Sequence, residues 1–158
     1  MATVLRGSDN LDSAKVLSEE LAGSIVVDSA GRVTMPYQPA VFATTYGSGG
    51  ASSVTGQIYY GNIKNNIGNH FNGRVFTAPI AGSYMVVATV LNRRSGANTI
   101  RLRHNGVAAS AQVYMNAYDE TATASACIYL NVNDTVDAYT SYEHYENDYG
   151  DFSCFLVG

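Results

Sequence analysis

Apolar and polar positions alternate with a period of two in several segments after residue 40, and Gly-, Ser- and Asn-rich loops separate these segments. This pattern is typical of an all-β domain. We predict ten short strands, at Val41–Thr45, Gln57–Tyr60, His70–Phe71, Val75–Phe76, Tyr84–Leu91, Thr99–His104, Ala108–Tyr114, Ala124–Leu130, Thr135–Thr140 and Phe152–Val157. Strands of this number and spacing indicate a sandwich or jelly roll.

Turn residues predict how the strands connect. The pairs Asn72-Gly73 and Asn105-Gly106 each lie between β-prone runs, and both residue types tolerate the positive φ of a type I′ hairpin turn. Because connections alternate between the two ends of a jelly roll, we expect these turns and Asn131–Asp134 at one end. The other end is then formed by the loops Arg93–Asn98, Tyr118–Thr121 and Ser141–Asp151.

The strands differ in how their two faces are composed. Ile100–Arg103 and Val136–Tyr139 alternate between apolar and polar residues, as in a sheet with one wet face. Tyr84–Leu91, Ala126–Leu130 and Phe152–Val157 are apolar on nearly every position of both faces. An antiparallel sandwich has one internal core, so we expect other copies of the chain to cover the second face in a closed symmetric oligomer.

The residues expected to form either the core or the oligomer interface belong to these double-faced strands and to the first strand of the domain. They are Phe42, Tyr84, Val86, Val87, Ala88, Val90, Ile128, Leu130, Phe152, Phe155 and Leu156.

The first 38 residues have a different pattern. Leu11, Ala14, Leu17 and Leu21 recur at helical spacing and predict a short helix. Two β-prone runs around Asp28-Ser-Ala-Gly31 then predict a hairpin, and Pro36 and Pro39 follow. With too few apolar residues for a core of its own, the segment 1–38 is predicted to be an attachment arm, and 39–158 the folded head.

Composition excludes several classes of function. The chain of 158 residues has a net charge of −4, so no basic field attracts nucleic acid. We see no apolar stretch expected of a secretory signal or a membrane span. No nucleophile elbow or phosphate loop occurs, and His70, His104 and His144 are scattered, so we expect no catalytic activity. Cys127 and Cys154 are expected to be free thiols in the core.

The strand residues resemble the globular head of complement component one-q, within the tumour-necrosis-factor-like jelly-roll superfamily. The resemblance covers about Ala40 to Gly158 and rests on Tyr60, Asn66, Phe76-Thr-Ala-Pro-Ile-Ala-Gly-Ser-Tyr84, Leu102 with Asn105-Gly106, Ser125–Val136 and Phe152-Ser-Cys-Phe-Leu156. It implies a ten-strand jelly roll assembled as a homotrimer, with the double-faced strands at the threefold axis. The chain departs from the family pattern at Asn133 and Cys154 and in a shorter loop between Phe71 and Phe76.

The segment Ile25–Phe42 resembles the stretch that precedes such heads in bacteriophage fibre and virion proteins. This implies a non-enzymatic virion structural protein, assembled in the host cytoplasm and displayed on the particle as a capsid decoration or a short fibre. Other virion proteins would then contact residues 1–38. The alternatives are the receptor-binding tip of a tail fibre, or a cellular or secreted ligand-binding module.

One end of the predicted jelly roll is rich in Tyr and acidic residues, a composition that suits contact with a host-surface glycan or protein. The candidate contacts are Tyr118, Asp119, Glu120, Tyr142, Glu143, His144, Tyr145 and Tyr149. The alternative is a solvated acidic loop whose rings lie on neighbouring strands. Some heads of the resembled family bind calcium near this end, and Glu120 falls close to an acidic position used there. One matched carboxylate is few for an ion that takes six to eight oxygens, so we expect no cofactor and keep calcium as an alternative.

Overall fold

The computed structural model describes residues 26–27, 31, 33–34, 38–45, 55–146 and 149–157. The chain divides into two compact units, Met1–Gln38 and Pro39–Gly158. In the first unit, β1 (Val26–Val27) pairs antiparallel with β2 (Val33–Thr34), which confirms the predicted hairpin. The helix predicted between Leu11 and Leu21 lies outside the described residues. The role of the first unit as an arm stays a prediction.

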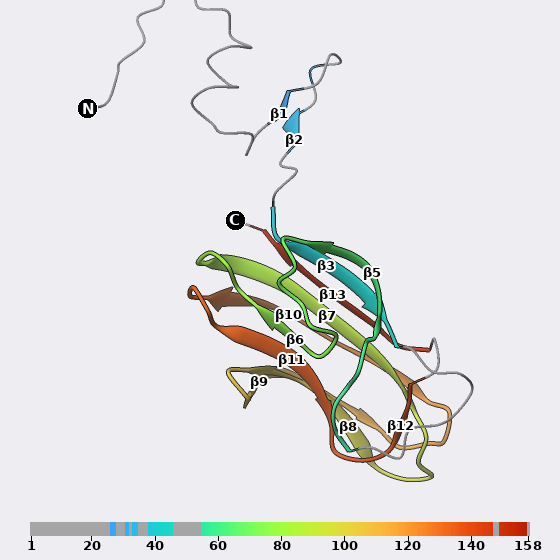
Figure 1. Ribbon diagram of the computed structural model, residues 1–158. Coiled ribbons are helices and arrows are strands. Elements are labelled where there is room, and N and C mark those ends of the chain that lie inside the picture. Colours follow the sequence, from blue (N-terminus) through green and yellow to red (C-terminus); the bar gives the residue numbers. More distant parts are fainter. Residues whose placement is uncertain are drawn as a thin grey trace, which may run out of the picture. The chain divides into compact units, whose positions relative to one another are not determined.

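The second unit contains two antiparallel sheets (Figure 1). The larger has the strand order β10 (Thr121–Leu130), β7 (Gly82–Asn92), β13 (Asp151–Leu156), β3 (Ala40–Thr44) and β5 (Asn62–Ile67), and β12 (His144–Tyr145) also pairs with β7. We call it the six-stranded sheet. Neighbouring strands are far apart in the sequence, which is the crossed connectivity of a jelly roll and confirms the expected all-β class.

The second sheet, which we call the five-stranded sheet, has the order β4 (Gly56–Gln57), β11 (Thr135–Thr140), β8 (Asn98–His104) and β9 (Val107–Met115). Its fifth strand, β6 (Val75–Thr77), pairs with the first half of β11. Among the described residues, no helix is long and apolar enough to cross a membrane.

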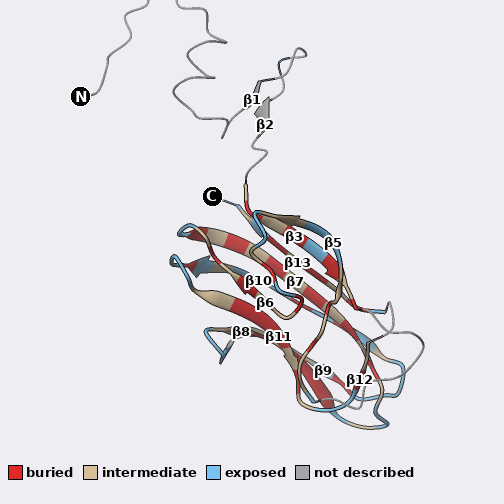
Figure 2. Ribbon diagram, in the orientation of Figure 1, coloured by how far each residue is buried: buried red, intermediate tan, exposed pale blue. Residues whose placement is uncertain are grey.

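The core lies between the two sheets. Buried and partly exposed positions alternate along the whole of β7, as Figure 2 shows, because successive side chains of a strand point to opposite faces. Phe152 of β13 is fully buried and stacks on Phe71, with ring centroids 4.9 Å apart. Removing a buried ring of this size typically costs about 3–5 kcal/mol. The side chain of Phe152 therefore anchors β13 to the core between the sheets.

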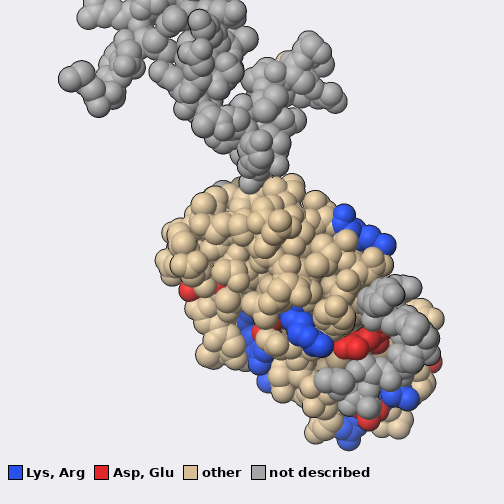
Figure 3. All heavy atoms as spheres, viewed as in Figure 1, with Lys and Arg blue, Asp and Glu red and all other residues tan. Residues whose placement is uncertain are grey.

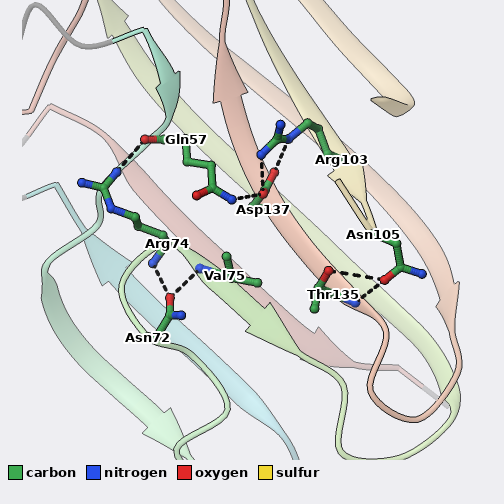
Figure 4. A network of polar contacts seen from close by, with 8 residues as sticks. All are labelled: Gln57, Asn72, Arg74, Val75, Arg103, Asn105, Thr135 and Asp137. Carbon is green, nitrogen blue, oxygen red and sulfur yellow. Dashed lines mark hydrogen bonds and ion pairs between the residues drawn. The ribbon is translucent and has the colours of Figure 1, made fainter. Parts of the chain in front are cut away.

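The two Asn-Gly turns differ from each other. At Asn105 and Gly106 the φ angles are 50° and 75°, which confirms the predicted type I′ hairpin between β8 and β9. At the other pair only Gly73 has a positive φ, of 92°, so the type I′ prediction is wrong there. The side-chain oxygen of Asn72 instead accepts hydrogen bonds from the backbone N–H groups of Arg74 and Val75, and these bonds shape a different turn (Figure 4).

The position predicted for the Asn72–Gly73 turn is also wrong. The Asn105 and Asn131–Asp134 turns do share one end, since Nδ2 of Asn105 donates to Oδ1 of Asp134 at 2.8 Å. The strand that follows Gly73, however, places Val75 opposite Asp137 in the middle of β11, and the carbonyl of Gly73 accepts from the N–H of Tyr60. The turn therefore lies alongside the sandwich, away from that end.

Two strands were not predicted. β5 has the sequence Asn-Ile-Lys-Asn-Asn-Ile, which lacks the apolar alternation used to identify strands, because an edge strand contributes little to the core. β12 is two residues long and forms only through its pairing with Asn92 and Leu91 of β7.

Candidate functional site

The loops Arg93–Asn98, Tyr118–Thr121 and Ser141–Asp151, which we call the apical loops, are hydrogen-bonded to one another in their described parts, as the strand order predicted. The buried side chain of Asn92 joins the first loop to the residue that precedes the second: its Nδ2 donates to the carbonyl oxygens of Arg94 at 2.9 Å and Ala117 at 2.7 Å. The backbone of Asn92 bonds to the second loop itself, through the carbonyl of Glu120 and the N–H of Asp119.

A second buried asparagine, Asn98, connects the third apical loop to Asn92. Nδ2 of Asn98 donates both to Oδ1 of Asn92 at 3.0 Å and to the carbonyl of Glu143 at 3.1 Å. Its Oδ1 accepts from the N–H of Tyr142 at 3.0 Å. The two asparagines therefore hold the apical loops in one arrangement.

Three tyrosines contact one another on this surface, and a fourth, Tyr142, packs against Arg94. The hydroxyl groups of Tyr118 and Tyr145 are hydrogen-bonded at 2.6 Å, and the ring of Tyr149 packs edge-on against Tyr145 with centroids 6.2 Å apart. This hydrogen bond with Tyr118 raises the pKa of Tyr145 to about 12, because it stabilises the protonated phenol. The guanidinium of Arg94 lies 3.8 Å from the ring centroid of Tyr142.

The tyrosine side chains remain accessible in spite of these contacts. Tyr118 is 51%, Tyr142 44% and Tyr149 60% exposed. The surface thus presents aromatic rings whose orientations are fixed by neighbouring side chains, which reduces the entropy lost on binding.

The acidic candidates have different surroundings. Oε2 of Glu120 accepts hydrogen bonds from the N–H groups of Asn116 at 2.6 Å and Ala117 at 3.0 Å, and these bonds lower the pKa of the carboxyl group. Asp119 has a φ of 60° and its N–H bonds the backbone of Asn92. Glu143 is exposed. Glu120 therefore stabilises the conformation of its own loop. Among the described residues, no group of three or more His, Cys, Asp or Glu side chains is placed to bind a metal ion.

His144 corrects the predicted contact set. Its side chain is fully buried under the apical loops, where Nδ1 lies 3.0 Å from Oγ1 of Thr140 and Nε2 lies 3.6 Å from Oε1 of Glu146. Burial lowers the pKa of the imidazole, and the nearby Glu146 carboxylate offsets part of this effect. The pairing of β12 with β7 turns this side chain inward, so His144 cannot touch a ligand at the surface.

The predicted core and interface residues fall into two groups, according to the face of the six-stranded sheet on which each side chain lies. Six are buried in the core: Tyr84, Val86, Ala88, Val90, Leu130 and Phe152. Two more, Ile128 and Leu156, are partly buried against that core. Phe42 and Phe155 are 42% and 43% exposed on the opposite face of the six-stranded sheet, where Val87 is also only partly buried.

The two cysteines are both free but lie in different environments. Cys154 is buried, as predicted, and desolvation raises the pKa of its thiol. Cys127 is exposed, so its prediction as a core thiol is wrong. Its position in β10, between Ala126 and Ile128, places it on the outward side of the alternation.

Sequence reasoning missed Asn92 and Asn98. Both border a loop rich in polar residues, where asparagine is common, so neither stood out. The one available signal is their position at the ends of β-prone runs, where a buried amide can satisfy loop backbone groups.

Comparison with known proteins supports the fold. The globular domain of zebrafish complement 1qA protein is similar to this chain with a TM-score of 0.57 and 17% sequence identity, over 77% of this chain and 98% of that chain. No protein-family model and no curated protein matches the sequence. At this identity the similarity shows the architecture alone, and the head of this chain therefore has the jelly-roll fold of a complement one-q globular domain.

Proposed function

We propose that the chain is a non-enzymatic, trimeric virion structural protein of a bacteriophage, a capsid decoration or short fibre. In this proposal residues 1–38 attach to the particle and the apical loops face outward. The observation that carries the assembly is the apolar outward face of the six-stranded sheet. Phe42 and Phe155 are large exposed side chains there, beside the partly buried Met85 and Val87.

The strand register brings these side chains together. Phe155 is opposite Met85, and Ser153 is opposite both Val87 and Phe42, so the apolar residues occupy adjacent positions of three neighbouring strands. A contiguous apolar patch on a sheet is stabilised when a second copy removes it from water. A threefold arrangement would cover this face on every copy and repeat the apical loops three times.

The virion location is supported by the resemblance of Ile25–Phe42 to phage proteins and by the separate first unit. The same fold suits a cellular or secreted ligand-binding module or a tail fibre tip. The proposed absence of catalysis rests on the sequence, which has no nucleophile elbow and no phosphate loop.

Antibodies raised against residues 39–158 would test the location. We expect them to label purified phage particles in electron micrographs, and to label the capsid or a short fibre. Deleting residues 1–38 should leave the trimer intact and prevent incorporation into particles. Labelling of the tail tip would favour the receptor-binding alternative, and labelling of cells or culture fluid without particles would favour the cellular module.

A further inference from the structure

The five-stranded sheet carries an uneven distribution of charge. Its five described strands contain one carboxylate, Asp137, against the guanidinium groups of Arg101 and Arg103. Basic side chains lie on the side of the head that carries β6 and β11 (Figure 3). The apical loops, in contrast, hold most of the acidic residues of the head.

Both oxygens of the single carboxylate, that of Asp137, accept hydrogen bonds from neighbouring side chains. Nε and Nη2 of Arg103 each donate to one oxygen of Asp137 at 2.7 Å, and Nε2 of Gln57 donates to Oδ2 as well (Figure 4). Asp137 is only 4% exposed. Its charge is therefore neutralised and shielded, and it does not repel an approaching anion.

Arg101 is bonded to hydroxyl groups instead of a carboxylate. Its Nη2 donates to Oγ1 of Thr99 at 3.1 Å and to Oγ of Ser141 at 2.7 Å. Its Nε is buried and has no acceptor among the described residues, so this donor does not reach a ligand at the surface. These contacts hold the guanidinium in place, and no carboxylate is hydrogen-bonded to it in the described part of the chain.

Aromatic and amide groups flank this arginine. The ring of Tyr139 lies between Arg101 and Arg103, with its centroid 5.7 Å and 4.4 Å from the two Cζ atoms. The register of β8 with β9 places the exposed Gln112 opposite Arg101, and Tyr114, which is 65% exposed, opposite Thr99. We call the surface formed by Arg101, Arg103, Gln112, Tyr114 and Tyr139 the Arg–Tyr face.

We propose that the Arg–Tyr face binds an acidic glycan, with Arg101 pairing a sugar carboxylate or sulfate and the Tyr114 ring packing against a sugar ring. A guanidinium presents several N–H donors in a plane that matches a carboxylate. An exposed phenol ring offers rigid apolar area with a polar edge, and Gln112 supplies donors and acceptors for hydroxyl groups.

A glycan suits this surface better than the other anionic polymers. A stable protein interface needs a large desolvated apolar centre, and the Arg–Tyr face offers one exposed ring among arginine and glutamine side chains. Nucleic acid is disfavoured by the net charge of −4, because its binding requires many phosphate contacts. A short anionic segment of sugar rings needs only one or two cations and a ring to stack on.

The test uses the full chain and oligogalacturonate of defined length, with the same oligomer after reduction of its carboxylates to alcohols as the neutral control ligand. We expect calorimetry to detect binding of the acidic oligomer, weaker at higher salt, and little binding of the reduced one. Arg101→Gln should weaken binding by about tenfold, the loss expected for one charged hydrogen-bonded pair. Tyr114→Ser should weaken it severalfold.

Lys64→Gln is the matched charge control, because Lys64 is exposed on β5 of the other sheet. Equal loss in Lys64→Gln and Arg101→Gln would overturn the proposal, as would equal binding of the reduced oligomer. A sulfated oligosaccharide of the same length serves as a second acidic ligand. Failure of both acidic ligands to bind would also contradict the proposal, as would a DNA duplex that binds more tightly than either of them. If circular dichroism shows that Arg101→Gln does not fold, Tyr114→Ser becomes the deciding variant. Unchanged binding of the acidic oligomer by Tyr114→Ser would then overturn the proposal. The result is independent of the virion location and of the apical tyrosines.

Discussion

The side-chain amides of Asn98 and Asn92 are hydrogen-bonded to each other inside the apical end, with Nδ2 of Asn98 donating to Oδ1 of Asn92 at 3.0 Å. Both residues are buried, and through their side chains and the backbone of Asn92 they bond backbone groups of all three apical loops. These two asparagines form a polar network that holds the apical loops and the tyrosine side chains that the loops carry. Every member of this network must be paired, because it lies away from water.

Asn92→Ala should lower the free energy of unfolding by about 3 kcal/mol, because the carbonyl of Ala117 and the amide of Asn98 lose their partner inside the protein. Urea denaturation followed by circular dichroism would measure the loss. Asn116→Ala is the matched control, since Asn116 is exposed and its side chain supports no loop, and it should change stability by less than about 0.5 kcal/mol. Equal values for the two variants would contradict the supporting role of Asn92.

Adjacent valines of β7 should separate folding from assembly. Val86 is fully buried in the core, whereas Val87 faces outward beside Ser153 and Ser125. We expect Val86→Asp to unfold the head, because it buries an unpaired charge, and Val87→Asp to leave a folded monomer. Light scattering and circular dichroism distinguish the two results. A wild-type chain that is monomeric in solution would refute the trimer.

Acid should destabilise the apical end through His144. Burial lowers the pKa of this imidazole in the folded state, so the unfolded chain takes up the proton first as the pH falls. The contribution of His144 is complete above the unfolded pKa of about 6.5 and declines as the pH falls towards the lower folded value. His144→Gln should therefore flatten the fall in melting temperature between about pH 7 and pH 5. An unchanged slope would show that other groups cause it.

The exposed apical tyrosines should affect attachment without affecting assembly. Replacing Tyr142, Tyr145 and Tyr149 with Ser removes ring area from the surface and leaves the core untouched. If the apical loops contact a host glycan or protein, particles carrying this triple variant should adsorb to cells several times more slowly, because threefold repetition multiplies each loss. Normal adsorption with correct assembly would favour capsid decoration.

Local signals in the sequence were enough to predict a sandwich or jelly roll and many of its parts. The alternating pattern of Ile100–Arg103 in β8 and the Asn105-Gly106 pair depend on interactions between residues close in the chain, and both were confirmed. The wet face predicted for Val136–Tyr139 of β11 is wrong at Asp137, which is buried by its bonds to Arg103 and Gln57. The same local reasoning failed at Asn72-Gly73, because the side chain of Asn72 bonds the following N–H groups and so changes the turn. It also missed β5, whose residues pair with β3 but bury little.

The details of the apical end were decided by tertiary structure. The sequence determined that three loops rich in tyrosine and acid share one end, since strand order implies it. Whether a given side chain points outward depends on residues far away in the chain: His144 is buried because β12 pairs with β7, and Glu120 is held by its own loop's N–H groups. Asn92 and Asn98 resemble any loop asparagine until folding brings their partners within hydrogen-bond distance. Burial and pairing over such separations are properties of the folded chain, which is why composition alone could not assign them.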